Sequence, residues 1–298
     1  MLFRTLRISG PFDLVILSEL GVQYAWVAKI VAIYNRAPLV VDAFVGMYET
    51  NVEDWARVGA KSVRGRIYRL FDWLSAQLSN IALVDTNVRM KRLERDGADK
   101  VVSCPVGAPG WAKPAPAQPR SGRFRLLYYG NYIPLHGLEY VVANLAILND
   151  VNMEIVFIGD GEGRPPIEIL ANGAGISSIE FRGNIPESDL IQEIHDSDVV
   201  LGVFGDSEKA ATVLANKVWQ GLAAGRYVVT RTSEALSEVQ DIVGAQIKAV
   251  DIEDPFGLAI AIREIASTPL TFNGAHAELE RYVESKFQEL RNAISDIV

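Results

Sequence analysis

The stretch VVLGVFGDSEKAATVLANKVWQGLAAGRYVVT, Val199 to Thr230, decides the fold. Its apolar beginning at 199–204 is typical of a buried strand, and a polar loop follows over 205–211. Apolar residues then recur at helical spacing over 213–223, and the β-branched run at 227–230 indicates another strand. The stretch therefore predicts a strand, a loop, a helix and a strand in succession, which is the repeating unit of a parallel α/β sheet.

The loop of this unit is a candidate anion site. Ligands of parallel α/β sheets bind beyond the carboxyl ends of the strands, where the first N–H groups of a helix attract negative charge. The loop ending near Thr212 therefore predicts a phosphate site at the helix start, with Asn216 and Lys217 in the same turn and Gln220 one turn later. The alternative is a solvated helix face of an ordinary α/β domain, because such folds host many functions.

Composition limits the class of protein. A chain of 298 residues with 49% hydrophobic and 22% charged residues has room for two folded domains. Cys104 is the only cysteine, which excludes an intrachain disulfide and a multi-cysteine metal site and favours a reducing, cytoplasmic setting. The net charge of −8 makes nucleic acid an unexpected partner.

The remaining sequence predicts two sets of alternating strands and helices. A β-α-β unit over 12–41 opens the first set and places Asp42 at the carboxyl end of its second strand. The alternative interpretation of Asp42 is a loop or helix-capping carboxylate. Six strands over 126–250 form the second set and predict a complete doubly wound sheet. We therefore expect four parts: an N-terminal domain at 1–106, a proline-rich linker at 107–122, a second domain at 123–274, and C-terminal helices at 275–298 that pack back on the first domain.

The segment Asn51 to Ser79 combines basic and aromatic residues at helical spacing. One interpretation is a helix that lies on a membrane surface, which would make the protein a peripheral membrane protein at the inner face of the membrane. The other interpretation is a helix whose apolar stripe lies in the core and whose basic face is solvated. The sequence favours the second without excluding the first.

Four motifs in the second set resemble those of the group 1 glycosyltransferases, most closely glycosyltransferase family 4. They occur in the family's order and spacing: the glycine-rich loop GNYIPLHG at 130–137, IGDG at 158–161, FRGNIP at 181–186 with the Asp-Leu and Ser-Asp pairs that follow, and the helix ending in GLAAG at 221–225. In the first half, VDAFVGMYET at 41–50 resembles the strand-end segment of the family's acceptor domain.

This resemblance implies the GT-B fold, in which two Rossmann-like doubly wound domains face each other across a cleft. We expect a shortened N-terminal domain, because the family's usual first strand and glycine-rich loop have no match before residue 12; either the chain is truncated or the domain is unusually small. The implied activity moves a sugar, with retention of configuration, from a nucleotide-sugar donor to a glycan or lipid-linked acceptor in cell-surface polysaccharide or glycolipid biosynthesis. The resemblance implies neither a cofactor nor a metal; the nucleotide-diphosphate sugar is a substrate.

The chain departs from the family at four charged positions. Gln220 occupies the position of the glutamate that holds the nucleotide ribose, and Thr212 that of the glutamate that contacts the donor sugar. Asn131 and His136 replace the arginine and lysine of the first loop. Lys217, and His136 when it is protonated, are the candidates to restore positive charge near the diphosphate.

The expected roles follow from these positions. The amides of Gly130 and Asn131, the helix start near Thr212, and Lys217 would hold the phosphates.

The other donor-binding residues are Asn216 and Gln220, the latter on the ribose. Asp42, near the acceptor hydroxyl, and His136 are the candidate catalytic residues. Two alternatives remain open: a non-catalytic or partner-dependent subunit, because charges and N-terminal elements are missing, and a nucleotide-sugar epimerase.

Overall fold

The computed structural model describes residues 12–115, 123–148, 151–176, 179–268 and 275–298. These residues form two compact units. Unit 1 comprises residues 1–105 and 283–298, and unit 2 comprises residues 106–282. The expected linker at 107–122 lies at the start of unit 2, and its residues 116–122 are outside the described ranges.

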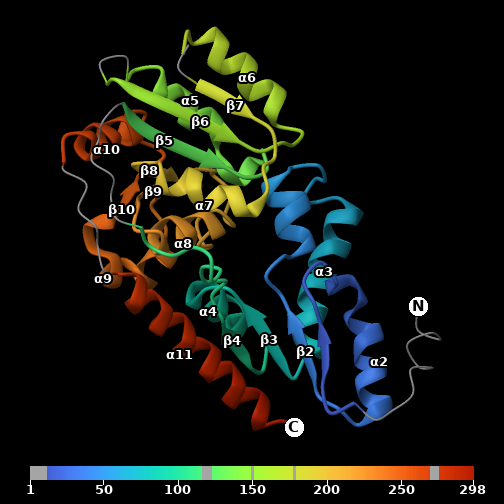
Figure 1. Ribbon diagram of the computed structural model, residues 1–298. Helices are drawn as coiled ribbons and strands as arrows, with labels where there is room; N and C mark the ends of the chain where they lie inside the picture. The colour runs from blue at the N-terminus through green and yellow to red at the C-terminus, as the bar shows by residue number, and fades with distance from the viewer. Residues whose placement is uncertain (1–11, 116–122, 149–150, 177–178, 269–274) are drawn as a thin grey trace. The chain divides into compact units, whose positions relative to one another are not determined.

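Unit 1 is built on a four-stranded parallel sheet with the strand order β1-β2-β3-β4 (Figure 1). Its elements follow in chain order: β1 (Val15–Leu17), α2 (Ala25–Asn35), β2 (Leu39–Asp42), α3 (Val63–Leu78), β3 (Ile81–Val84), α4 (Asn87–Arg95) and β4 (Val101–Ser103). In the described part of this sheet, strands that follow each other in the chain are also neighbours in the sheet. A reversal of strand order, which marks a doubly wound sheet, is found in unit 2.

The two faces of the unit 1 sheet are covered by different helices. Leu39 and Val41 pack with residues of α2, whereas Val40 packs with Ala293 of α11 (His276–Ser295). Because side chains alternate along a strand, α2 and the end of α11 lie on opposite faces. The final helix therefore completes the core of unit 1.

Unit 2 is built on a six-stranded parallel sheet with the order β10-β9-β8-β5-β6-β7. Its strands are β5 (Phe124–Tyr129), β6 (Met153–Ile158), β7 (Ile179–Arg182), β8 (Val199–Leu201), β9 (Tyr227–Arg231) and β10 (Ile247–Val250). Its main helices are α5 (Leu138–Leu145), α6 (Arg164–Gly173), α7 (Glu187–His195), α8 (Asn216–Ala223), α9 (Gln240–Val243) and α10 (Gly257–Ala266). The strand order reverses between β5 and β8, which is the point where ligands of such sheets bind.

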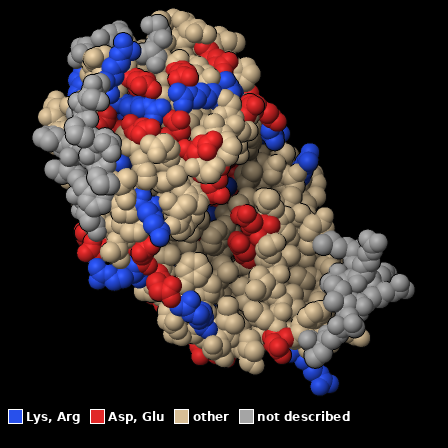
Figure 2. All heavy atoms as spheres, viewed as in Figure 1, with Lys and Arg blue, Asp and Glu red and all other residues tan. Residues whose placement is uncertain are grey.

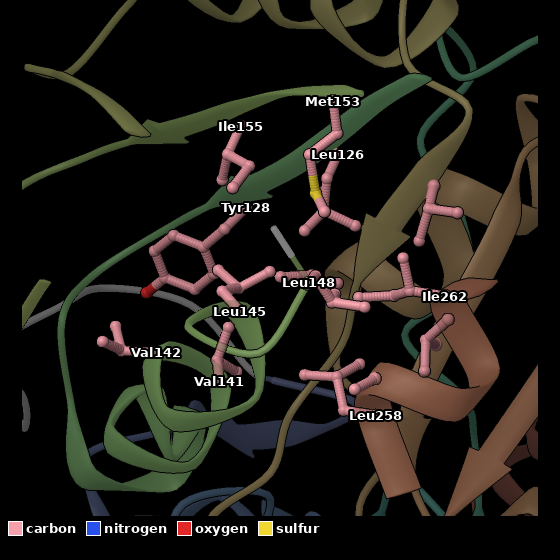
Figure 3. Packing of buried hydrophobic residues seen from close by; sticks show 14 of the residues in the cluster. Leu126, Tyr128, Val141, Val142, Leu145, Leu148, Met153, Ile155, Leu258 and Ile262 are labelled. Atoms are coloured by element: carbon pink, nitrogen blue, oxygen red, sulfur yellow. The ribbon is translucent and has the colours of Figure 1, made fainter. Parts of the chain in front are cut away.

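The core of unit 2 lies between the strands and the helices that cover them (Figure 3). Leu126 and Ile155 of the sheet are almost completely buried, as are Leu145 of α5 and Ile262 of α10. This packing fixes the end of β5, and with it the loop that follows.

Two helix boundaries differ from those the sequence predicts. The helix expected to begin near Thr212 begins at Asn216, and residues 207–212 form turns. The region 51–79 is not one helix: a π-helical turn at Glu49–Asp54 is followed by bends, and α3 begins only at Val63. Along the described segments, no helix is both long enough and apolar enough to cross a membrane.

Candidate functional site

The loop after β5 is shaped by glycines at both of its ends. Gly130 has a φ of +128° and Gly137 a φ of +57°, values that L side chains rarely adopt. A Cβ added to Gly137 would lie 2.3 Å from the carbonyl carbon of Phe204. The backbone of the loop therefore packs directly on the chain that follows β8, and only glycine permits this approach.

The IGDG motif supports the same loop by close packing. A Cβ on Gly159 would lie 2.1 Å from the carbonyl oxygen of Gly130, and a Cβ on Gly161 would lie 3.0 Å from the amide nitrogen of Tyr132. The Asp160 carboxylate accepts a hydrogen bond from the Gly161 amide at 2.8 Å. The motif thus serves to shape the loop and to bring two backbones together.

Beneath Gly130, Lys217 meets Tyr128 and His136. The Lys217 Nζ atom lies 4.3 Å from the centroid of the Tyr128 ring. A Cβ on Gly130 would lie 3.4 Å from both Lys217 Nζ and His136 Cε1. The ammonium group is fully buried, and among the described residues it has no hydrogen-bond partner.

Burial changes the protonation of this group of residues. It lowers the pKa of Lys217 well below its usual range, because the charged form loses its hydration. The pKa of His136 is also lowered well below its usual value, first by burial and then by the nearby Lys217. The Tyr128 hydroxyl lies 2.8 Å from His136 Nδ1 and donates to the Asn131 carbonyl oxygen at 2.9 Å. Burial therefore works against positive charge on both Lys217 and His136, and a bound anion would favour it.

Two expectations for this loop are wrong. His136 does not provide positive charge near neutral pH, because its imidazole is buried and its pKa is lowered. The Gly130 amide is not free for a phosphate, because it donates to the Ile158 carbonyl oxygen at 3.0 Å. For the Asn131 amide, by contrast, no hydrogen bond is found within the described ranges, and the Asn131 side chain is exposed.

Helix α8 begins after Thr212, so Thr212 is not at the helix start where a phosphate site was predicted. The Thr212 hydroxyl donates to the carbonyl oxygens of Glu208 and Lys209 at 3.2 Å, within the turns that precede the helix. The first amides of α8 belong instead to Asn216 and Lys217, and such amides have no partner within their own helix. The anion-attracting end of this helix is therefore four residues later than predicted.

Gln220 lies one turn further along α8. Its Oε1 atom accepts a hydrogen bond from the buried Tyr129 hydroxyl at 2.7 Å. Tyr129 is the last residue of β5, so this bond ties α8 to the strand that carries the first loop. With its oxygen used in this way, Gln220 has its amide nitrogen to offer to a ligand.

Asp42 belongs to unit 1, whereas the other seven predicted site residues belong to unit 2. It ends β2, and its carboxylate accepts a hydrogen bond from the Phe44 amide at 3.0 Å. Burial raises the pKa of Asp42, and Arg89 opposes that rise only weakly. This environment favours a carboxyl group that can exchange a proton closer to neutral pH.

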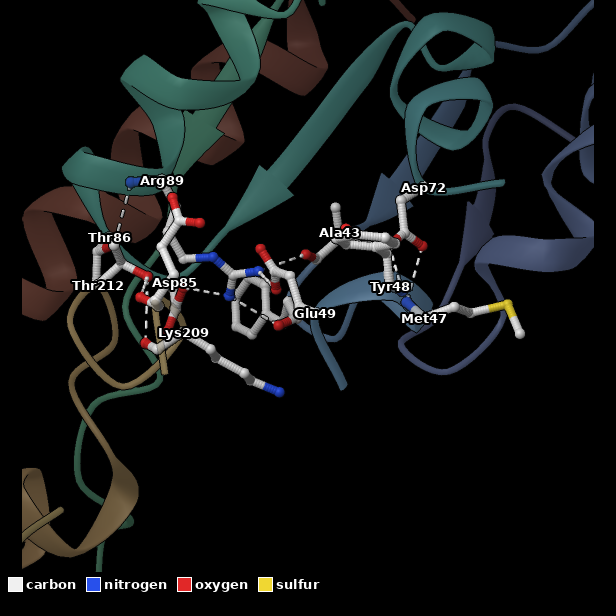
Figure 4. A network of polar contacts seen from close by, with 12 residues as sticks. Ala43, Met47, Tyr48, Glu49, Asp72, Asp85, Thr86, Arg89, Lys209 and Thr212 are labelled. Atoms are coloured by element: carbon white, nitrogen blue, oxygen red, sulfur yellow. Dashed lines mark hydrogen bonds and ion pairs between the residues drawn. The ribbon is translucent and has the colours of Figure 1, made fainter. Parts of the chain in front are cut away.

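Close to Asp42 in the sequence, unit 1 contains a polar network that sequence reasoning missed (Figure 4). The buried Arg89 forms ion pairs with Asp85 at 3.0 Å and with Glu49 at 2.6 Å, and donates to the Phe44 carbonyl oxygen at 2.8 Å. Asp72 accepts from two consecutive amides, those of residues 47 and 48, both at 2.8 Å. Burial raises the pKa of Asp72 to about 6. Its sequence signal is that it is the only carboxylate within the basic segment 55–79.

A cavity of about 770 Å³ lies beside this network. Its walls include the charged groups of Glu49, Arg69 and Asp72 and the apolar side chains of Leu70 and Trp73. A cavity that mixes aromatic, apolar and hydrogen-bonding groups is typical of a small-molecule site. Unit 1 therefore has a candidate ligand site of its own.

Comparison with known proteins gives one family and many structures. Residues 123–268 match the family model described as "Glycosyl transferases group 1". No curated protein sequence matches the chain significantly.

Three similar structures illustrate the shared fold. HepE from Anabaena, in complex with UDP and glucose, superposes with a TM-score of 0.69 at 14% identity, covering 95% of this chain and 78% of HepE. Sucrose-phosphate synthase from Thermosynechococcus elongatus gives 0.72 at 16% identity, with 98% and 74% covered. A UDP-forming trehalose-phosphate synthase from Burkholderia xenovorans gives 0.70 at 12% identity, with 99% and 76% covered. At these identities the likeness establishes the fold.

Proposed function

We propose that this protein transfers a sugar from a nucleotide-sugar donor. The proposal is supported by residues 123–268, which match the group 1 glycosyltransferase family model, and by the GT-B fold. The acceptor in this proposal is a glycan or a lipid-linked glycan. The reaction retains anomeric configuration, needs no metal, and belongs to the biosynthesis of a cell-surface polysaccharide or glycolipid. It takes place in the cytoplasm.

The observation that carries the proposal is the state of Lys217. A fully buried amine without a hydrogen-bond partner is costly, and it is rare unless a ligand completes its surroundings. It lies under Gly130 at the carboxyl end of β5, next to the point where the strand order reverses. A diphosphate at this point would supply the missing anionic acceptor.

The rest of the donor would follow from the same geometry. The first amides of α8, at Asn216 and Lys217, and the Asn131 amide are suited to the phosphate oxygens. The amide nitrogen of Gln220, held by Tyr129, is suited to a ribose hydroxyl. These contacts would stabilise the negative charge that the leaving diphosphate gains in the transition state. The related fold of HepE accommodates UDP-glucose, which makes uridine diphosphate sugars the first donors to test.

On the acceptor side, Asp42 is the candidate for a polar group near the reacting hydroxyl. The cavity of unit 1, with Arg69, Asp72 and Trp73 on its walls, is the candidate site for the acceptor itself. Aromatic and charged side chains together suit a sugar ring that carries polar substituents.

A second candidate function is a partner-dependent or non-catalytic subunit. It is favoured by the neutral residues Asn131 and Gln220, and by a His136 that burial keeps uncharged. Such a protein would bind a donor weakly and transfer nothing alone.

The test is calorimetric titration of the purified chain with uridine and guanosine diphosphates and their common sugar conjugates. We expect one of them to bind, and a Lys217→Ala variant to bind it at least about tenfold more weakly. Lys248→Ala is the matched control, because Lys248 is a solvent-exposed lysine of the same unit, paired with Glu264 at 3.1 Å. Absence of binding to every compound would overturn the proposal in favour of the partner-dependent subunit.

A further inference from the structure

Lys217 and His136 lie close together in the interior of unit 2, and each can take up a proton. Figure 2 shows other Lys and Arg side chains at the surface, interspersed with Asp and Glu. Lys217 and His136 are buried instead, and among the described residues no carboxylate acts on the pKa of either. Positive charge on Lys217 also lowers the pKa of His136, so the two repel a second proton. An anion bound here therefore favours one proton, on one of the two.

Tyr128 contacts both groups from β5. It is completely buried in the core of unit 2 (Figure 3). The centroid of its ring lies 4.3 Å from Lys217 Nζ. The imidazole of His136 meets the ring edge to face, with the centroids 5.7 Å apart and the planes at 72°. The face of an aromatic ring attracts a cation, most strongly where water is excluded, so this ring favours charge on Lys217.

The hydroxyl of Tyr128 determines which nitrogen of His136 carries the hydrogen. The hydroxyl has one hydrogen and lies 2.9 Å from the Asn131 carbonyl oxygen, which can only accept, so it donates to that oxygen. It also lies 2.8 Å from His136 Nδ1. Because its hydrogen is already used, the hydroxyl oxygen accepts there, and Nδ1 is the donor. The neutral imidazole therefore has its hydrogen on Nδ1 and its lone pair on Nε2.

We propose that Tyr128 is a positioning residue of the donor site, which directs the proton taken up with a bound diphosphate to Lys217 and keeps His136 neutral. The diphosphate in this inference rests on the proposed function. Once charged, Lys217 has the ring face on one side and phosphate oxygens as acceptors of charge-assisted hydrogen bonds.

The titratable groups that face Lys217 within the described residues are Tyr128 and His136. The Asn131 carbonyl favours a proton on His136, but burial and the charge of Lys217 both act more strongly against it. The alternative is a proton on Nε2 of His136 and a neutral Lys217. The ring face would then support no charge, and the buried amine would lose the gain of a charge-assisted bond.

The test is NMR of the full chain, labelled with ¹⁵N in its three histidines and with ¹³C at the ε carbons of its lysines, with and without uridine diphosphate. The ¹⁵N shifts distinguish the two neutral forms of imidazole from the charged form. We expect the neutral Nδ1–H form of His136 in both states. We expect Lys217 to become charged on binding, at a pH between its free and bound pKa values. Lys217→Met and His136→Gln assign the two signals.

Two substitutions of Tyr128 separate its ring from its hydroxyl. Tyr128→Phe keeps the ring, so Lys217 should take up the proton as in the wild type, whereas His136 loses its acceptor and should change to the Nε2–H form. Tyr128→Leu also removes the ring and should weaken proton binding by Lys217 in the free chain about 30-fold relative to Tyr128→Phe. The control is Tyr140→Phe, which removes a hydroxyl that donates to the Asp254 carbonyl oxygen at 2.9 Å and should change neither signal.

A charged His136 in the diphosphate complex, or an Nε2–H form in the wild type, would overturn the proposal. So would equal proton binding by Lys217 in the two Tyr128 variants, because a merely structural tyrosine would lower the stability of both without separating them. Absence of diphosphate binding together with the expected results for the free chain would overturn the proposed function and leave the role of Tyr128 in placing the charge.

Discussion

Replacing Lys217 with methionine is predicted to make the protein more stable and the donor site weaker. Methionine matches the length of the lysine side chain without its amine, so it fills the same buried space beside Tyr128. Replacement of buried charged groups by apolar residues of similar volume stabilises proteins by up to about 1–4 kcal/mol. The same change removes the buried amine that lies beneath Gly130.

The sign of the stability effect follows from proton linkage. Because the folded pKa of Lys217 lies below the unfolded value, the unfolded chain binds more protons between the two values. Stability therefore falls as the pH drops through the unfolded value of about 10.4, and stays reduced below the folded value. Each unit by which the pKa is lowered costs about 1.4 kcal/mol at low pH. Lys217→Met removes this cost, so its advantage over the wild type should grow as the pH falls.

Two assays on one pair of proteins test the prediction. Thermal unfolding should show a higher Tm for Lys217→Met, by roughly 2–4 °C for each kcal/mol gained in a domain of this size. Calorimetry should show binding of the diphosphate weakened about 10- to 150-fold, the value of one charge-assisted hydrogen bond of roughly 1.5–3 kcal/mol. A variant that is destabilised and binds the diphosphate as well as the wild type would refute the reasoning, because Lys217 would then be a structural residue.

Three further predictions concern the two units separately. Asp72→Asn should remove a pH dependence of stability, because the folded carboxyl holds its proton to a higher pH than the unfolded one. As the pH rises from below 3.8 to above 6, the free energy of unfolding of the wild type should fall by about 3 kcal/mol relative to that of the variant. Urea denaturation at both ends of this range measures the difference. Arg89→Met should lower the free energy of unfolding by about 3–5 kcal/mol, because it leaves buried carboxylates without their ion-pair partner. The control Arg95→Met, at an exposed position on the same helix, should change it by under about 0.5 kcal/mol in the same assay. Gly159→Ala should abolish donor binding in calorimetry, because its Cβ would lie 2.1 Å from the Gly130 carbonyl oxygen.

Each of these changes has an outcome that contradicts it. A pH profile of Asp72→Asn parallel to that of the wild type would show that this carboxyl is not perturbed. A mild Arg89→Met variant would show that the network of Figure 4 contributes little to stability. Gly173→Ala is the control for Gly159→Ala, because no atom lies within 4 Å of a Cβ at Gly173, and equal behaviour of the two variants would remove the steric argument.

Much of the fold could be predicted because strands and helices of parallel sheets carry strong local patterns. The apolar run 199–204 predicts a buried strand, and the structure has β8 at its start, Val199–Leu201. The four motifs of the second set, in their order and spacing, carry the resemblance to the family. Helix starts were harder to place. The turns at 207–212 are helix-like in composition. The true start of α8 at Asn216 has no local sequence signal, because its N-cap is Ala215 rather than one of the usual capping residues.

The chemistry of the site depended on burial, which a sequence does not display. His136 is polar and titratable in the sequence, so a role as a cation was reasonable; only the packing of Tyr128 and Lys217 against it makes that role wrong. Arg89 and Asp72 were missed for the opposite reason. In the sequence both look like solvated residues of basic helices, and their importance comes from partners up to 46 positions away.

The central claim is that a diphosphate completes the surroundings of Lys217, and proton uptake on binding tests it most directly. The bound anion should raise the pKa of Lys217, so binding should take up a proton and weaken as the pH rises above the free-state value. Titrating uridine diphosphate in two buffers of different ionisation enthalpy measures this uptake. At a pH between the free and bound pKa values of Lys217, the account predicts uptake approaching one proton for the wild type and a clear loss of it in Lys217→Met. Tight binding without proton exchange, or equal exchange in both proteins, would contradict it.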